Sequence, residues 1–193
     1  MILSVVKYGN PVLRQKGARI EAVTPEIKKL IADMFETMKA ANGVGLAAQQ
    51  VAHALQLTVL DVSEASAERP STLELDGKPA DVVKFMPLVL INPEVKPVND
   101  PVSGGEGCLS FPEIYAEISR PESIDVAALN AKGARIQFRC GGLLAKAIQH
   151  EADHLNGILF IDRMDKKTKA ELKLELDELQ FVTKAELAQA KKK

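Results

Sequence analysis

The stretch "QHEADHLNG", residues 149–157, contains the pattern His-Glu-x-x-His. It belongs to a predicted helix over about 143–156, which follows Gly141-Gly142 and ends at Asn156-Gly157. On a helix, His150 and His154 lie one turn apart on the same face, an arrangement that suits metal binding. Apolar residues at helical spacing predict that this helix is buried: Leu144, Ala147, Ile148 and Leu155.

The segments around this helix predict strands in runs, with helices kept apart from them. A helix over 24–42 can be capped by Thr24, and a last helix covers about 165–180. Strands are predicted at 55–62, 82–95 (interrupted at Pro87), 113–119, 123–129 and 134–139, with a loop or hairpin insertion at 63–81 and a loop at 99–107. We therefore predict an α+β fold, in which antiparallel strands surround the His-Glu-x-x-His helix, with an N-terminal and a C-terminal helix.

The composition indicates an ordinary globular protein. Of 193 residues, 46% are hydrophobic and 26% charged, and the net charge is −1, which favours neither nucleic acid nor an anionic membrane as a partner. No apolar run reaches the roughly 18 residues that a membrane span needs. The first residues do not resemble a signal peptide, so we expect a cytoplasmic protein whose two cysteines are free thiols or metal ligands.

The two histidines leave the third ligand of a metal site open, since a catalytic zinc-type site usually takes three protein ligands and keeps one position for water. The motif alone also occurs by chance on surface helices. Phe160 stands where a metzincin would have its third histidine, and His53 is predicted to be a surface residue. A thermolysin-like site would use Glu171 or Glu175, but these lie in a segment dense in Lys and Glu that is typical of a solvated face.

Cysteine is the remaining source of a third ligand. Cys108 lies in "GGEGCLSFPE" (104–113), a predicted loop from which its sulfur can turn toward a helix. One thiolate and two imidazoles form a known ligand set with an open fourth position. We predict that Cys140, at the end of a strand, is a small buried thiol. If it were a ligand as well, the four side chains would form a closed structural zinc site.

Three motifs together resemble those of a known family. "GVGLAAQQ" (43–50), "EGCLS" (106–110) and "QHEADHLNG" are similar, in this order, to the motifs of bacterial peptide deformylases. "YGNPVLRQKG" (8–17) is similar to the N-terminal part of that family, and the likeness extends over most of residues 1–165. No phosphate-binding glycine pattern is present, which argues against nucleotide binding.

The resemblance implies an enzyme that removes the formyl group from the formylmethionine of nascent polypeptides and releases formate. It implies that Cys108, His150 and His154 hold Fe²⁺, which Zn²⁺, Ni²⁺ or Co²⁺ can replace. Glu151 is then the general acid and base, and Gln50 and the backbone N–H of Leu109 stabilise the oxyanion.

The resemblance also implies a substrate site. Gly45 pairs its backbone with the peptide, and an apolar pocket receives the methionine side chain, with Val44, Glu106, Leu143, Ala147 and His150 as its candidate residues. The chain departs from the family at Lys146, Ala147 and Tyr115. A basic Lys146 at the rim is expected to favour acidic residues further along the substrate. Asp153 is either a hydrogen-bond partner of a ligand imidazole or a surface carboxylate.

The end of the chain resembles the family less closely. We predict a catalytic domain over 1–165 and a C-terminal helix with a charged tail over 166–193. In some bacterial deformylases the C-terminal helix docks near the ribosomal exit tunnel. Four lysines here allow either that role or that of a solubilising face: Lys166, Lys167, Lys169 and Lys173.

Overall fold

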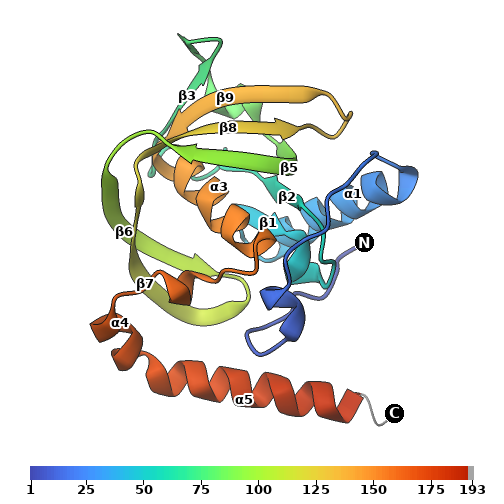
Figure 1. Ribbon diagram of the computed structural model, residues 1–193, viewed down its shortest axis with the longest axis vertical. Coiled ribbons are helices and arrows are strands. Elements are labelled where there is room, and N and C mark those ends of the chain that lie inside the picture. Colours follow the sequence, from blue (N-terminus) through green and yellow to red (C-terminus); the bar gives the residue numbers. More distant parts are fainter. Residues whose placement is uncertain (191–193) are drawn as a thin grey trace.

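The structure is a computed structural model that describes residues 1–190, and it has two antiparallel sheets with helices (Figure 1). The larger sheet has the strand order β1-β2-β5-β8-β9-β3-β4, and β6 pairs with β7 in a second sheet. The strands are β1 Gly45–Ala47, β2 Leu57–Leu60, β3 Ser71–Leu75, β4 Lys78–Pro79, β5 Leu88–Pro97, β6 Pro101–Cys108, β7 Phe111–Pro121, β8 Ser123–Leu129 and β9 Arg135–Gly141. The helices are α1 Pro25–Ala40, α2 Val82–Phe85, α3 Gly142–Leu155, α4 Lys166–Glu171 and α5 Lys173–Ala190. The prediction of an α+β fold with antiparallel strands is confirmed.

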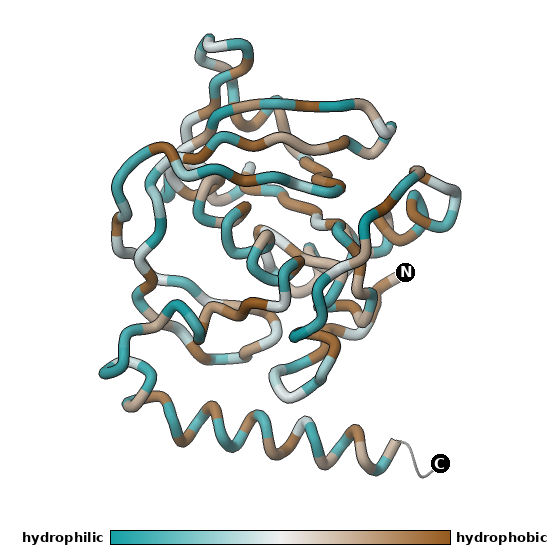
Figure 2. Tube along the Cα trace, in the orientation of Figure 1, coloured by the Kyte–Doolittle hydropathy of each residue, from teal (hydrophilic) through white to brown (hydrophobic). Residues whose placement is uncertain are grey.

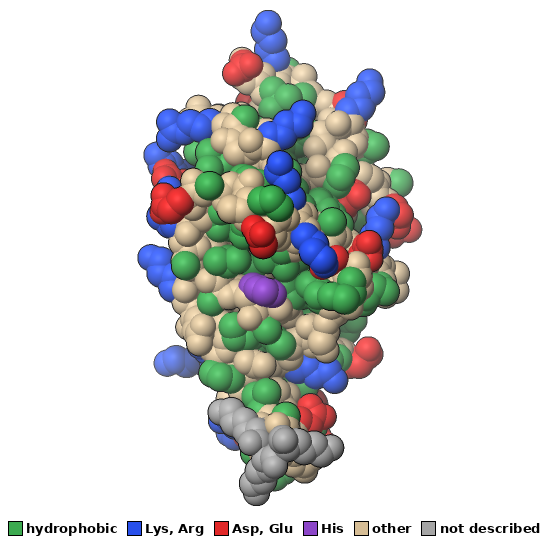
Figure 3. Space-filling view, turned by 90° about the vertical axis from the view of Figure 1, so that its right-hand side faces the viewer, with side chains coloured by type: hydrophobic (Ala, Val, Ile, Leu, Met, Phe, Trp, Pro, Cys, Tyr) green, Lys and Arg blue, Asp and Glu red, His purple; other side chains and the backbone are tan. Residues whose placement is uncertain are grey.

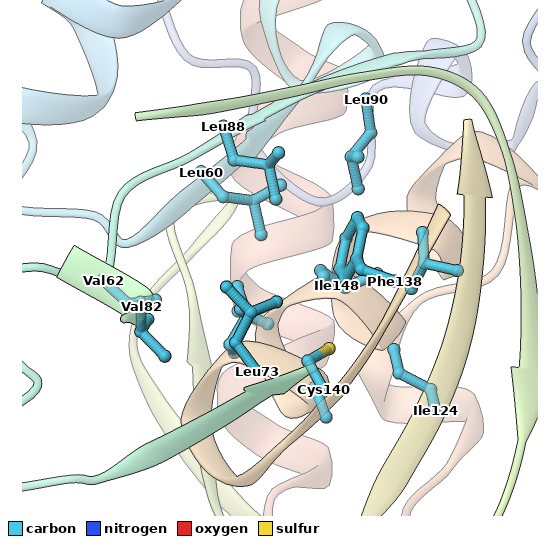
Figure 4. Close-up of a cluster of buried hydrophobic side chains, with 14 of the residues drawn as sticks. Leu60, Val62, Leu73, Val82, Leu88, Leu90, Ile124, Phe138, Cys140 and Ile148 are labelled. Atoms are coloured by element: carbon cyan, nitrogen blue, oxygen red, sulfur yellow. The ribbon is translucent and has the colours of Figure 1, made fainter. Parts of the chain in front are cut away.

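Helix α3 lies against the inner face of the larger sheet. It contacts β5, β8 and β9 on one side and β7 on the other, so it runs between the two sheets (Figure 1). Ile148 of α3 packs with Leu90 and Phe138 in a cluster of buried apolar side chains (Figure 4). Cys140 of β9 belongs to the same cluster and is 1% exposed, as predicted for a small buried thiol. Burial of this apolar surface holds α3, and with it both histidines, in one position.

Helix α1 forms where the sequence predicts it. The Thr24 side chain accepts a hydrogen bond from the backbone N–H of Ile27, which caps the first turn. Ile31, Met34 and Met38 recur on one face and are buried in a second core cluster. α1 packs against β1 and β2, and Gly45 of β1 lines the cleft described below.

Strand β6 corrects the prediction of a loop at 99–107. This segment is rich in Gly, Pro and Ser and lacks alternating apolar residues, so its sequence predicts no strand. Its backbone nevertheless pairs with β7 from Pro101↔Pro121 to Gly107↔Tyr115. On β7 the buried and exposed residues alternate, and this strand provides the apolar packing that β6 lacks. Cys108 is therefore the last residue of a strand and not part of a loop.

The predicted strand over 82–95 is wrong in its first part. Val82–Phe85 form the short helix α2, because the Asp81 side chain accepts hydrogen bonds from the backbone N–H groups of Val83 and Lys84. The strand β5 begins only at Leu88 and extends to Pro97. The preceding polar segment contains the β3–β4 hairpin, so the hairpin reading of 63–81 was the better one.

The C-terminal part forms two helices instead of one. α4 ends at Glu171, with Leu172 as its C-cap, and α5 continues to Ala190, beyond the predicted end at 180. Leu172, Leu176 and Leu179 share one face and pack on a third core cluster, beneath β7. Figure 2 shows hydrophilic and hydrophobic residues alternating along α5. Residues 191–193 of the predicted tail lie outside the described part of the chain.

The surface carries mixed charges. The face drawn in Figure 3 intersperses basic, acidic and apolar side chains. His53 is exposed, as predicted. Within residues 1–190, none of the helices has both the length and the apolar character needed to cross a membrane.

Candidate active site

The structure brings Cys108, His150 and His154 together. The histidines come from α3 and the cysteine from the end of β6, and one ligand atom from each lies within 4.8 Å of the others. Cys108 Sγ is 3.3 Å from Nε2 of His154. These three donor atoms, one sulfur and two imidazole nitrogens, suit a divalent metal ion of intermediate softness, and they leave its fourth coordination position open.

Glu106 orients the imidazole of His150. Its Oε2 lies 3.0 Å from Nδ1 of His150, which leaves Nε2 of that ring for an ion. Arg120 donates to both carboxylate oxygens of Glu106, at 2.5 and 3.0 Å. Burial alone would raise the pKa of Glu106, but the hydrogen bonds from His150 and Arg120 outweigh burial and lower the pKa to about 2. The carboxylate is therefore ionised and stays paired throughout the neutral range.

The same arginine connects β7 to α3. Arg120 also donates to Asp153 at 2.8 Å, and Arg163 donates to Asp153 at 2.6 and 3.1 Å. Asp153 is therefore neither a surface carboxylate nor a hydrogen-bond partner of a ligand imidazole, the two alternatives that the sequence left open. It is buried, and its partners are Arg120 and Arg163. Nδ1 of His154 has no hydrogen-bond partner among residues 1–190.

Arg120 is the residue that sequence reasoning missed. It is 3% exposed and stands at an inward position of β7, after Ile114, Ala116 and Ile118. A charged residue in the apolar register of an alternating strand signals a buried ion pair, because a buried charge without a partner is costly. That signal is present in the sequence, but it does not reveal the partners.

Glu151 is buried at the base of the site. Burial raises its pKa to about 7, although the nearby charges of His150 and Arg120 lower it. Its Oε2 has no hydrogen-bond partner among residues 1–190. A Cβ atom at Gly45 would lie 2.5 Å from its Oε1, so the carboxylate occupies space that the missing side chain leaves. A carboxyl that titrates near neutral pH suits the transfer of a proton in both directions.

Gln50 presents its amide N–H groups to the site. Its Oε1 accepts from the backbone N–H of Ala47 at 2.9 Å, which fixes the orientation of the amide. Its Nε2 then lies 3.5 Å from Cys108 Sγ and 3.4 Å from Ser110 Oγ. An oriented donor beside a metal centre can stabilise negative charge that develops on a substrate oxygen.

A cleft of about 590 Å³ opens above these groups. Its lining includes every residue that the sequence analysis assigned to catalysis or substrate binding: Val44, Gly45, Gln50, Glu106, Leu109, Leu143, Ala147 and Glu151. Cys108 and His150 also line it, together with Lys146 and Tyr115. His154 lies deeper, at 1% exposure.

The two rival ligand sets do not form. Glu171 and Glu175 are exposed on α4 and α5, and neither joins the Cys108 group. Cys140 is held in the apolar core, where burial raises the pKa of its thiol to about 12. A thiol with that pKa stays protonated at neutral pH and is a poor metal ligand.

A family model for polypeptide deformylase matches residues 2–170. The chain belongs to the polypeptide deformylase family. As a member of this family, the chain is an enzyme, a hydrolase that acts on N-formylmethionyl peptides.

Individual deformylases are similar to this chain over nearly its whole length. A peptide deformylase of Opitutus terrae is 44% identical over 187 residues, which are 96% of each chain. A mutant of peptide deformylase 1B from Arabidopsis thaliana has a structure with a TM-score of 0.82 at 34% identity, covering 96% of this chain and 94% of that one. A deformylase from Synechococcus elongatus, solved with actinonin, gives a TM-score of 0.73 at 36% identity, covering 94% and 85%.

Proposed function

We propose that Cys108, His150 and His154 hold one Fe²⁺ ion, which Zn²⁺, Ni²⁺ or Co²⁺ can replace, and that the deformylase reaction takes place beside it. The proposal rests on the grouping of these three side chains at the base of a cleft that also contains Glu151 and Gln50. When bound, such an ion lowers the pKa of water from about 15.7 to about 7 and so supplies a nucleophile at neutral pH. α3 is then the central, metal-bearing helix of the fold.

Glu151 moves the proton. Its carboxylate accepts a proton from the attacking water and delivers it to the amine that leaves when the formyl C–N bond breaks. Burial and the proximity of Gly45 place this carboxylate at the cleft without a competing hydrogen bond to Oε2 from residues 1–190. Its raised pKa, about 7, matches the donor role as well as the acceptor role.

Two donors stabilise the charge on the formyl oxygen. One is the side-chain amide of Gln50, and the other is the backbone N–H of Leu109, which directly follows Cys108. Losing one such donor typically costs about 3 kcal/mol of transition-state stabilisation.

The peptide binds as an added strand. β1 is the edge strand of the larger sheet, and among residues 1–190 β6 pairs with β7 alone, so within this part of the chain each strand has an unpaired backbone edge. Gly45 and Gly107 of these strands line the cleft, where their backbone groups can pair with an extended peptide. Val44, Leu143 and Ala147 then form apolar walls around the methionine side chain, next to Glu106 and His150.

The remaining proposals concern the whole molecule. We assign catalysis to residues 1–165 of a cytoplasmic enzyme and treat residues 166–193 as an appended C-terminal helix with a charged tail. Lys166, Lys167, Lys169 and Lys173 of that segment are the residues through which it would meet the ribosome.

The decisive experiment measures formate released from formyl-Met-Ala-Ser by protein purified without oxygen and loaded with Fe²⁺ or Ni²⁺. The Glu151→Ala variant is expected to keep its metal and lose release. Glu171→Ala, which removes an exposed carboxylate, serves as the matched control and retains release. Cys108→Ser is expected to lose the metal itself. Absence of formate from folded, metal-loaded wild type would contradict the proposed function.

A further inference from the structure

Two cationic side chains stand at one side of the cleft and form no ion pair within the described part of the chain. Arg69 is exposed in the loop before β3, and Lys146 is half-buried on α3. Both line the cleft, and both also line an adjoining hollow of about 210 Å³. The ion pairs formed within residues 1–190 involve neither of them. Their charges are therefore available to a ligand.

Lys146 reaches across the cleft wall to β6. A Cβ atom at Gly104 would overlap its Nζ, so the ammonium lies directly beside the bare backbone of that residue. Gly104 precedes Cys108 by four positions on the same strand. At about 3.3 Å per residue, the ammonium is about 13 Å along the strand from the metal ligand.

The direction of the peptide follows from β6, given the proposed function. The formyl group must lie at Cys108, where β6 ends in the turn to β7, so the peptide extends back along β6 toward Gly104. Side chains of an extended chain alternate between two sides. If the first side chain enters the walls formed by Leu143 and Ala147 of α3, the third points to the same side, about 7 Å further along. That is the side of the cleft on which Arg69 and Lys146 lie.

We propose that Arg69 and Lys146 make this enzyme prefer formyl peptides with an acidic side chain at the third residue. This inference rests on the proposed function and adds a substrate class to it. The one exposed carboxylate that lines the cleft within the described chain, Glu113, stands on β7 near the hairpin turn, at the opposite end of the peptide path. The buried carboxylate of Glu106 is already paired with Arg120. One exposed carboxylate, Glu122, lines the adjoining hollow but not the cleft. Within the cleft itself, the charges on the side that the third side chain meets are those of Arg69 and Lys146.

The test compares kcat/KM for four peptides with amidated C-termini: formyl-Met-Ala-Glu, formyl-Met-Ala-Gln, formyl-Met-Glu-Ala and formyl-Met-Gln-Ala. We expect Glu to exceed Gln about five-fold at the third residue in low salt, and the two to be equal at the second residue. The preference should shrink in high salt, because exposed charges are screened.

Variants connect the preference to its residues. In the double variant Lys146→Met with Arg69→Gln, the ratio of Glu to Gln at the third residue should fall to about one. Lys132→Gln, which removes an exposed charge from the turn between β8 and β9, should keep the wild-type ratio. Equal rates for all four peptides, a preference at the second residue, or a ratio unchanged in the double variant would each overturn the inference while leaving the deformylase activity intact. No formate from any peptide would overturn the proposed function itself.

Discussion

Replacing Arg120 with methionine is expected to destabilise the folded protein strongly. The substitution removes the cation that pairs with Glu106 and Asp153, and the side chains of Arg120 and Glu106 are both only 4% exposed. The pKa of Glu106 is lowered from 4.5 to about 2, which corresponds to about 3 kcal/mol of stabilisation shared between Arg120 and His150. Breaking one side of a buried ion pair typically costs about 3 to 5 kcal/mol. We therefore expect the free energy of unfolding to fall by about 3 kcal/mol and the melting temperature by about 6 to 12 °C.

The loss should depend on pH. The pKa of Glu106 is lower in the folded protein than in the unfolded chain, so its ionised form stabilises the fold above pH 4.5. That stabilisation disappears as the pH falls from 4.5 toward about 2, where the carboxyl becomes protonated in both states. The difference in unfolding free energy between wild type and Arg120→Met should consequently narrow over this range.

The assay is urea unfolding of metal-free protein at about pH 7 and about pH 3, compared with Arg139→Met. Arg139 makes a similar two-pronged pair with Asp125 across neighbouring strands, at 2.8 and 3.0 Å, but these side chains are 46% and 47% exposed. Exposed pairs contribute little, so this variant should unfold like the wild type. If Arg120→Met unfolded as Arg139→Met does, the reasoning from burial would be refuted.

Four further substitutions test three separate features of the structure. Gly45→Ala places a methyl group 2.5 Å from an oxygen of Glu151, so formate release should fall by about 100-fold while metal content, measured by elemental analysis, stays unchanged. Cys108→Ser should lose the metal in the same measurement and Cys140→Ser should keep it, because the second thiol is buried with a pKa of about 12; equal metal loss would contradict this. Gly9→Ala puts a Cβ 2.9 Å from a backbone oxygen of α5, at a residue with a φ of +111°, so α5 should become easier to remove by limited proteolysis; unchanged digestion would contradict that packing.

The sequence predicted the parts of the fold whose residues repeat with a clear period. The apolar face of α1 and the alternation along β7 are examples, since burial of one face leaves a pattern that can be read locally. β6 has no such pattern, because its backbone pairing with β7 defines it and its side chains contribute little. The prediction of a strand at α2 was wrong because Val82 and Val83 favour strands. The Asp81 side chain caps the N-terminus of a helix there instead.

The sequence motifs predicted most residues of the candidate site. They did not predict the hydrogen bonds and ion pairs that these residues form with one another. Glu106 was expected in the methionine pocket, and the contact of its carboxylate with His150 was not foreseen. Arg120 was missed because its partners, Glu106 and Asp153, are 14 and 33 residues away in the chain. Such contacts exist only after the sheets and α3 have packed, so no local pattern can predict them.

Four glycines line the cleft: Gly43, Gly45, Gly105 and Gly107. Positions without side chains expose the main chain, and main-chain groups recognise any peptide in the same way, whatever its side chains. An enzyme that meets the first residues of very many different new proteins gains generality from such walls. Discrimination between substrate peptides is then confined to the few positions where a side chain projects into the cleft. A substitution at such a position can change which peptides react fastest without altering the chemistry.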